Sequence, residues 1–431
     1  MFGGVCRAFY DLVFSMRGTA AFVVVDTSTD QTLHASSWLL ERAIEVHWSF
    51  FGSPGWLGFP WVPSDHQVAR TNSFRIMLPL LSGCGNLSSL VLTGIVVSGE
   101  HQQVIYSLPH LRKITLRSAR FRCTDLEIPK HNVTHLLLFN APDEEALSHI
   151  LRQTSSTLES LRVSDGVTKA FSHDTPRCPR LTAFTYINTT RSICKGAMTF
   201  MQQHSSIRVL RLYLAYTDQT LGPNFLHNLT KVTTNGDLGG WFFARPELKE
   251  FYQHPNDKIG WVDDVWSCFE RDQRSRLDPP QLEQLRIAVL HESDDSGALP
   301  IISYFFGKTL RKLHIWIEKY SLDHSHDFSY LVGGWSMLMG PRSLYGSQAT
   351  VKFARLRSIR VSFKLIKGIE FPEATCRQLL RDSILPLCPV LEEASFTALS
   401  SYETIEQEEP EDEMELRIGK NGGVWDLTPQ G

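Results

Sequence analysis

The stretch NLSSLVLTGIVVSGEHQQVIYSLPHLRKITL (86–116) contains two copies of one pattern, apolar-x-x-apolar-x-apolar, each placed directly after a turn-forming or polar residue. NLSSLVL opens the stretch and HLRKITL closes it. A single match carries little weight in a chain with 42% hydrophobic residues, so the spacing of the copies has to decide. Further copies are NVTHLLL (132–138), TLESLRV (157–163), RLTAFTY (180–186), SIRVLRL (206–212), NLTKVTT (228–234), QLEQLRI (281–287), TLRKLHI (309–315), RLRSIRV (355–361) and VLEEASF (390–396).

The first seven copies keep a regular spacing. Their leading apolar residues are 24, 22, 25, 23, 26 and 22 residues apart, within the range of about 20–29 that is typical of leucine-rich repeats. These leading residues are Leu87, Leu111, Val133, Leu158, Leu181, Ile207 and Leu229.

Between the copies lie stretches with apolar residues three or four apart, which predict helices. The sequence therefore predicts an α/β fold, an irregular leucine-rich-repeat solenoid (horseshoe) of strand-loop-helix units with a parallel sheet. The helical stretches are EEALSHILRQ (144–153), GAMTFMQQH (196–204), GALPIISYFF (297–306) and RQLLRDSILPL (377–387).

We expect the solenoid to span residues 18–400. The regular spacing breaks at about 236–280 and 317–354, and we predict long loops with some local helix for these two insertions. Residues 401–431 follow as an acidic tail with eight carboxylates between Glu403 and Glu415, a composition typical of disordered segments.

Composition excludes several classes of partner and compartment. A formal net charge of -3 gives no global attraction to nucleic acid or to an anionic membrane. The eight cysteines include no C-x-x-C pair, so we expect reduced, mostly buried thiols. The apolar run 22–25 is too short for a signal peptide or a membrane span, and we expect a cytoplasmic or nuclear protein.

Four groups of residues resemble parts of catalytic or metal sites, but their context argues against each. Gly307-Lys308-Thr309 lacks the earlier glycine of a phosphate-binding loop, and the histidines and carboxylates of 323–327 lack a distant fourth ligand. Adjacent Asp263-Asp264 carboxylates diverge, and Cys84 has no histidine near it in sequence. We therefore expect no enzyme activity, cofactor or metal. An enzyme would need converging titratable groups in the two insertions.

The repeats, especially SLPHLRKITLRSARF (107–121) and TLESLRV, resemble the leucine-rich-repeat region of fungal F-box proteins. VCRAFYDLV (5–13) resembles the closing helix of an F-box, so residues 1–17 are either a partial F-box-like segment or a capping helix over the first repeat. The resemblance implies the substrate-recognition part of an F-box-like ubiquitin-ligase adaptor. It implies a Skp1-type adaptor as partner only if a complete F-box precedes this helix. An orphan repeat scaffold without a ligase link is the alternative.

The strand period predicts which side chains leave the core, because alternate residues of a strand point to opposite faces. Eight of the predicted outward residues are Lys or Arg, whereas only Glu393 is acidic. We therefore predict a concave binding face for an acidic or phosphorylated protein ligand, with the 403–415 tail as a competing pseudo-ligand. The alternative is that these charges only keep an exposed sheet soluble. The predicted binding residues are Lys113, Arg117, Arg162, Arg211, Tyr213, Lys231, Arg286, Lys312, His314, Trp316 and Arg360.

Overall fold

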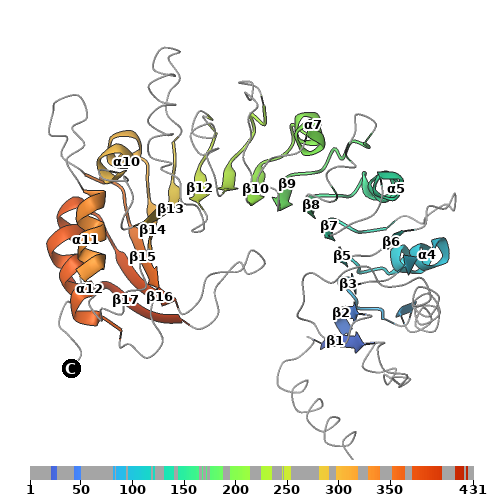
Figure 1. The fold of residues 1–431 in the computed structure, drawn as a ribbon, viewed down its shortest axis with the longest axis horizontal. Coiled ribbons are helices and arrows are strands. Elements are labelled where there is room, and N and C mark those ends of the chain that lie inside the picture. Colours follow the sequence, from blue (N-terminus) through green and yellow to red (C-terminus); the bar gives the residue numbers. More distant parts are fainter. Residues whose placement is uncertain are drawn as a thin grey trace, which may run out of the picture. The chain divides into compact units, whose positions relative to one another are not determined.

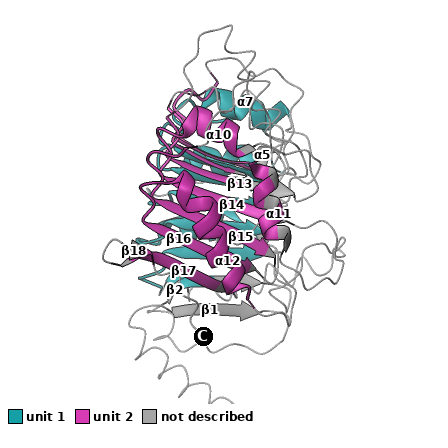
Figure 2. Ribbon diagram, turned by 90° about the vertical axis from the view of Figure 1, so that its left-hand side faces the viewer, with its two compact units in different colours: residues 1–207 teal, residues 208–431 magenta. Residues whose placement is uncertain are grey.

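The chain has the α/β class predicted from its sequence, and it divides into two compact units. Met1–Ile207 forms unit 1 and Arg208–Gly431 forms unit 2 (Figure 2). A computed structural model describes residues 21–26, 43–49, 81–82, 84–93, 96–117, 120–121, 131–139, 144–164, 167, 171, 175–187, 195–213, 225–234, 245, 247–253, 281–290, 298–318, 329–339, 352–364, 371–399, 413–421 and 424–425.

Unit 1 is built on a parallel sheet whose strands follow the order of the chain. The hydrogen-bonded order is β1-β2-β3-β5-β7-β8-β9, and each neighbouring pair is parallel. A small separate sheet pairs β4 (Val96–Val97) with β6 (Arg120–Phe121). The strands of the main sheet are β1 (Ala21–Asp26), β2 (Ala43–Ser49), β3 (Ser89–Thr93), β5 (Lys113–Arg117), β7 (His135–Phe139), β8 (Ser160–Ser164) and β9 (Ala183–Ile187).

Two helices of unit 1 lie in the crossovers between its parallel strands, and the third follows its last strand, β9. They are α4 (Gly99–Ser107), α5 (Glu144–Thr154) and α7 (Lys195–Gln203), and Figure 1 shows them along the same face of the sheet. The last two confirm the helices predicted at 144–153 and 196–204. On α5, Leu147 and Leu151 are four residues apart and fully buried, so one apolar stripe of the helix packs on the sheet.

Unit 2 repeats this arrangement, with short strands from β10 to β12 and seven-residue strands from β13 to β16. Its strands from β10 to β16 are parallel and again follow chain order. Two further strands, β17 (Glu413–Asn421) and β18 (Val424–Trp425), are antiparallel additions at the end of the sheet. The parallel strands are β10 (Val209–Tyr213), β11 (Lys231–Thr234), β12 (Glu250–Gln253), β13 (Gln284–Leu290), β14 (Lys312–Glu318), β15 (Ser358–Lys364) and β16 (Glu393–Leu399).

The helices of unit 2 also lie along one face of its sheet (Figure 1). The structure confirms the helix predicted at 297–306. The stretch predicted at 377–387 is the end of a longer helical segment, in which an α-helix is followed by a π-helix and then by a 3-10 helix. Within the second insertion, α11 contains Gly333-Gly334-Trp335, and Trp335 is buried. The helical elements are α10 (Ala298–Phe306), α11 (Ser329–Leu338), α12 (Glu373–Leu379), the π-helix η2 (Leu380–Ile384) and the 3-10 helix η3 (Leu385–Leu387).

All eleven copies of the sequence pattern form parallel strands, five in unit 1 and six in unit 2. Their leading apolar residues, from Leu87 to Leu391, are all buried. In most copies the N–H of this residue donates a hydrogen bond to the carbonyl three or four residues earlier. An example is the bond of 3.1 Å from Leu87 N–H to the Cys84 carbonyl. The pattern therefore encodes a buried turn followed by a strand.

A second recurring contact fixes the register between neighbouring strands. The Ser88 carbonyl accepts hydrogen bonds from the N–H groups of both Arg112 and Lys113, at 2.9 and 3.0 Å. Equivalent paired bonds recur from β7 to β9 and from β11 to β16. Side chains at the same repeat position are consequently aligned in rows across each sheet.

Three strands differ from the sequence-based expectation, β12, β17 and the short β18, which also lies inside the predicted tail. β12 lies inside the predicted insertion at 236–280, where we expected loops with local helix. β17 lies inside the predicted disordered tail, where Glu413–Asn421 instead pairs with the whole of β16. Its residues Met414, Leu416 and Ile418 alternate with charged neighbours, and Ile418 is buried.

Three sequence-based interpretations lie outside the described residues. They are the F-box-like or capping helix at 1–17, the Asp263-Asp264 pair and the 323–327 cluster.

Candidate binding faces of the two sheets

The face of each sheet opposite the helices is called here the open face. It is formed by alternate strand residues, for example Lys113, Thr115 and Arg117 of β5 or Lys312, His314 and Trp316 of β14. Residues between them, such as Leu116 and Ile315, are buried under the helices. The predicted binding residues lie at open-face positions, Lys113, Arg117 and Arg162 in unit 1 and the remaining eight in unit 2.

On unit 1, two arginines share one aromatic ring. Arg117 of β5 is in register with Phe139 of β7, and Arg162 lies on β8, the next strand. The guanidinium carbons are 5.6 Å (Arg117) and 5.3 Å (Arg162) from the centroid of the Phe139 ring. Cation–π contact at this range holds both half-buried guanidiniums in place. The sequence analysis did not identify Phe139 as part of the binding face. The contact depends on the register between neighbouring strands, which the sequence does not give.

Lys113 is exposed and lies at the other end of β5. In register it aligns with His135 and Ser160. It is therefore separated from the Arg117–Phe139–Arg162 cluster along the strand direction.

On unit 2, register aligns one long polar row across the open face. We call its central part, Arg286, His314 and Arg360, the arginine row. These three residues come from β13, β14 and β15 and are all half-buried. The full row, in strand order, is Arg211, Thr233, Tyr252, Arg286, His314, Arg360, Ser395 and Arg417.

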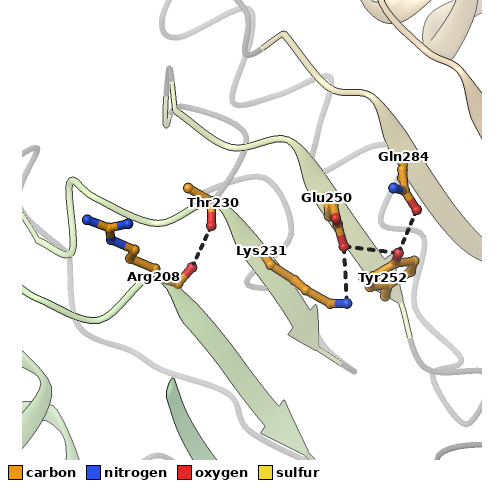
Figure 3. A network of polar contacts seen from close by, with 6 residues as sticks. All are labelled: Arg208, Thr230, Lys231, Glu250, Tyr252 and Gln284. Atoms are coloured by element: carbon orange, nitrogen blue, oxygen red, sulfur yellow. Dashed lines mark hydrogen bonds and ion pairs between the residues drawn. The ribbon is translucent and has the colours of Figure 1, made fainter. Parts of the chain in front are cut away.

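Lys231 contributes to an internal polar network. Its ammonium lies 3.1 Å from the Glu250 carboxylate and 4.7 Å from the centroid of the Tyr252 ring. The Tyr252 hydroxyl lies 3.2 Å from Glu250 Oε2 and 3.0 Å from Gln284 Oε1 (Figure 3). Burial and the neighbouring Glu250 carboxylate raise the pKa of the Tyr252 phenol. Because β12 was not recognised in the sequence, this counter-charge for Lys231 was missed.

His314 is hydrogen-bonded across to the adjacent strand. Its Nε2 lies 2.7 Å from the Ser362 hydroxyl of the adjacent strand. Burial, and then the positive charges of Arg286 and Arg360, hold the pKa of His314 well below its ordinary value. Arg360 in turn donates from Nε to the Thr397 hydroxyl at 3.0 Å.

Trp316 differs from the expectation of an exposed ligand contact. It is 1% exposed, and its row neighbours Ser362 and Thr397 are 1% and 0% exposed. Its indole Nε1 has no hydrogen-bond partner within the part of the chain that the structure describes. An open-face position therefore does not make this residue accessible.

The remaining predicted residues of unit 2 are accessible to different degrees. Arg211 and Tyr213 of β10 are half-buried, and Lys312 of β14 is exposed. Lys312 aligns with Gln284 and Ser358, one position along the strands from the arginine row.

The charge of the open face is less one-sided than the sequence predicted. Besides Glu393, the face carries Glu250 on β12 and Glu415 on β17. Each of these two is held by a cation: Glu250 by Lys231, and Glu415 by Arg417 at 2.8 Å. The excess of arginine at the centre of the unit 2 face remains.

The catalytic candidates that the structure describes do not form a catalytic site. Gly307 follows the end of α10, whereas the glycine of a phosphate-binding loop precedes a helix. Cys84 is buried, and burial raises the pKa of its thiol to about 11. Among the described residues, no group of three or more His, Cys, Asp or Glu side chains is placed to hold a metal ion.

In the part of the chain with assigned structure, no helix has both the length and the apolar character needed to cross a bilayer.

No model of a known protein family matches the sequence, and no curated protein matches it either. Arguments about function therefore depend on the geometry of the open faces.

Proposed function

We propose that the chain is a non-catalytic protein-binding module, built as an irregular leucine-rich-repeat solenoid. The regular strand spacing, the recurring buried turn and the paired carbonyl contacts between neighbouring strands support this interpretation. Each unit buries one face of its sheet under helices and leaves the other to bind a partner.

The arginine row is the observation that carries the proposal. Arg286 and Arg360 lie on β13 and β15, the two strands that flank β14, so the backbone that carries them is already ordered before a ligand binds. Arg211 lies in the same row, and Arg162 adds a further guanidinium on unit 1. The positive charge of these arginines favours an acidic or phosphorylated protein ligand.

Charge reversal tests the proposal directly. Partners captured by the wild-type chain are compared with those of the triple variant Arg162→Glu, Arg211→Glu, Arg286→Glu over a range of salt concentrations. We expect the triple variant to lose the salt-sensitive partners while it keeps its melting temperature. Recovery of the same partners at the same salt concentration would instead mean that the open-face charges only solvate the sheet.

A matched control reverses three exposed arginines that lie outside the open-face strands. These are Arg152 on α5, Arg180 in the turn before β9 and Arg355 in the turn before β15. Because the change in net charge is identical, this triple variant should retain the partners.

A narrower proposal, the substrate-recognition part of an F-box-like ubiquitin-ligase adaptor, is supported by the resemblance of VCRAFYDLV alone. An orphan repeat scaffold is the alternative. Most of an F-box's contact with a Skp1-type adaptor comes from the two helices that this segment does not match. Calorimetry with such an adaptor should therefore detect no binding at micromolar affinity or tighter. Binding of that strength would favour the ligase role over the scaffold.

A further inference from the structure

One row of the unit 2 open face is buried, although the helices lie on the other side of the sheet (Figure 1). Trp316, Ser362 and Thr397 come from β14, β15 and β16 and are in register with one another. They are 1%, 1% and 0% exposed. We call these three residues the covered row, and what lies above the sheet has to account for their burial.

The neighbouring strands do not account for the burial of Trp316. In register, this residue lies between Ala288 of β13 and Ser362 of β15, and both of these residue types are small. An indole between two small neighbours extends above the sheet surface, where solvent would reach it. Its burial therefore means that another segment of the chain lies over the open face here.

The indole N–H also requires a partner from that segment. Trp316 Nε1 is buried and has no acceptor within the described part of the chain. Buried polar groups are nearly always hydrogen-bonded. Because the segment that covers the indole also excludes water from it, we expect the acceptor to belong to that segment.

Residues 400–412 begin and end beside the covered row. They join β16 to β17, and Leu399, the last residue of β16, is in register with Glu413, the first residue of β17. About two residues are enough to join antiparallel neighbours, so a connection of thirteen is long enough to fold back over the sheet. Trp316 lies two strands from β16, about 10 Å, a distance that about three extended residues can span.

Charge favours this segment over the other connections of unit 2. It carries six carboxylates and no Lys or Arg, and the arginine row lies two residues before the covered row on the same face. Arg286 and Arg360 interact with further groups of the chain, as carboxylates held beside the row require. Residues 254–280 carry both signs of charge, and the acidic residues 291–297 lead into α10 on the opposite side of the sheet (Figure 1).

We propose that residues 400–412 fold back over the open face of unit 2, bury Trp316 and compete with an acidic partner for the arginine row. Because the segment is tethered beside the row, it acts at a high effective concentration. A partner has to displace it, which raises the affinity that a partner needs. The cover itself follows from burial and chain length, whereas its regulatory effect rests on the proposed binding function.

Oxidation of Trp316 by hydroxyl radicals tests the cover without a partner. Trypsin releases residues 313–319 (LHIWIEK), in which Trp316 is the one tryptophan, and tandem mass spectrometry isolates its oxidation. Trp335, buried on α11, serves as an internal reference in the same full-length chain. We expect wild-type Trp316 to be protected as well as Trp335.

Two variants remove different parts of the interaction. Replacement of residues 400–412 by a Gly/Ser segment of equal length should raise Trp316 oxidation roughly fivefold or more, while Trp335 stays protected. Neutralising the six carboxylates should raise it as well. It should also abolish the effect of added salt, because salt weakens an ionic cover in the wild type alone. The neutralised variant carries Glu403→Gln, Glu406→Gln, Glu408→Gln, Glu409→Gln, Glu411→Gln and Asp412→Asn.

The matched control is the same Gly/Ser replacement at residues 291–297, which should leave Trp316 protected. Wild-type protection in the 400–412 Gly/Ser variant, or exposure of Trp316 by the control alone, would overturn the cover. Wild-type protection in the neutralised variant would overturn the role of charge. If Trp335 also loses protection in the 400–412 Gly/Ser variant, unit 2 has unfolded and the neutralised variant decides.

The two proposals fail separately. Exposure of Trp316 in the 400–412 Gly/Ser variant without any gain in captured partners would keep the cover and remove the binding role of this part of the open face. Unchanged oxidation of Trp316, together with loss of partners in the charge-reversal triple variant, would remove the cover and keep the binding module. Exposure with increased capture supports both.

Discussion

His204 Nε2 accepts a hydrogen bond of 2.9 Å from the backbone N–H of Cys178, 26 positions earlier in the chain. Since this nitrogen accepts, the proton of the neutral ring is on Nδ1, which donates to the Phe200 carbonyl at 2.7 Å. The centroid of the Phe200 ring lies 4.1 Å from the centroid of the imidazole and 4.4 Å from the centroid of the Phe171 ring. Through these two hydrogen bonds, the neutral histidine connects the end of α7 to the turn before β9.

The stability of unit 1 should fall in mild acid because of this histidine. Burial lowers the pKa of His204 in the folded chain below 6.5, and the charge of Arg177 adds to the shift. The unfolded chain therefore takes up a proton first, and stability is complete above about pH 6.5 and falls as the pH drops towards the folded pKa. Urea denaturation between pH 7.5 and 5 measures this loss.

The control for this prediction is a histidine on the surface. His204→Gln should reduce the pH dependence at the expense of stability at neutral pH, while the half-buried His131 retains its own contribution. His110→Gln, in an exposed turn, should leave the wild-type slope unchanged. Equal slopes in wild type and His204→Gln would show that another group controls the acid sensitivity.

Gly307→Ala should destabilise unit 2 by about 1–3 kcal/mol because an added Cβ has no space. That atom would meet the Ser303 carbonyl oxygen and lie 2.6 Å from the Lys352 carbonyl oxygen, both of them backbone atoms. Gly85→Ala is the matched control, since its Cβ would meet nothing within 4 Å, and we expect a change within about 0.5 kcal/mol. Thermal melts of the two variants with equal midpoints would contradict the close approach.

β12 escaped prediction because its sequence departs from the repeat in two respects at once, whereas β11, with Thr234 at its third position, keeps the spacing. In a regular copy the third apolar position faces the core, but in ELKEFYQ (247–253) that position is Gln253. Its leading residue Leu248 also follows Leu229 by only 19 residues, below the usual repeat length. Both the pattern and the spacing fail there, although the buried Phe251 still pairs with Val232 in the sheet.

The acidic tail illustrates a different failure. Its carboxylates favour a disordered chain, whereas the alternating Met414, Leu416 and Ile418 favour a strand. Pairing with the edge of β16 decides between them, and that edge exists only in the folded protein.

Open-face positions were predictable from the period of two, but their accessibility and pairing were not. Whether Trp316 is buried depends on what packs beside it, and the partner of Lys231 depends on which strand lies next in the sheet. Register and neighbours are tertiary properties that no single segment contains.

Leu210→Ala should cost about 2–5 kcal/mol of unfolding free energy, because the side chain is fully buried on β10 and its removal leaves a cavity. Arg208→Ala, two residues earlier and exposed, keeps the backbone carbonyl that accepts from Thr230 N–H and should be close to neutral. Urea denaturation measures both. An unchanged midpoint in Leu210→Ala would contradict the register of this strand.

The buried thiols should be chemically inert in the folded protein. Cys84, Cys178 and Cys388 each stand three residues before a leading leucine, and the carbonyl of each accepts that leucine's N–H at 3.0–3.1 Å. Burial raises the pKa of Cys84 to about 11 and those of Cys178, Cys376 and Cys388 to about 12, so almost no thiolate forms at pH 8.

A thiol-reactive disulfide such as dithionitrobenzoate measures this inertness. Replacing the other four cysteines, Cys6, Cys123, Cys194 and Cys268, with serine leaves only the four buried thiols. We expect no rapid release of the chromophore from this variant in the native state and about four equivalents after unfolding in guanidinium chloride. Adding Arg355→Cys, at an exposed position, should restore one fast equivalent and verify the assay. Rapid native-state release without that addition would mean that the turns before the strands open far more readily than their buried hydrogen bonds suggest.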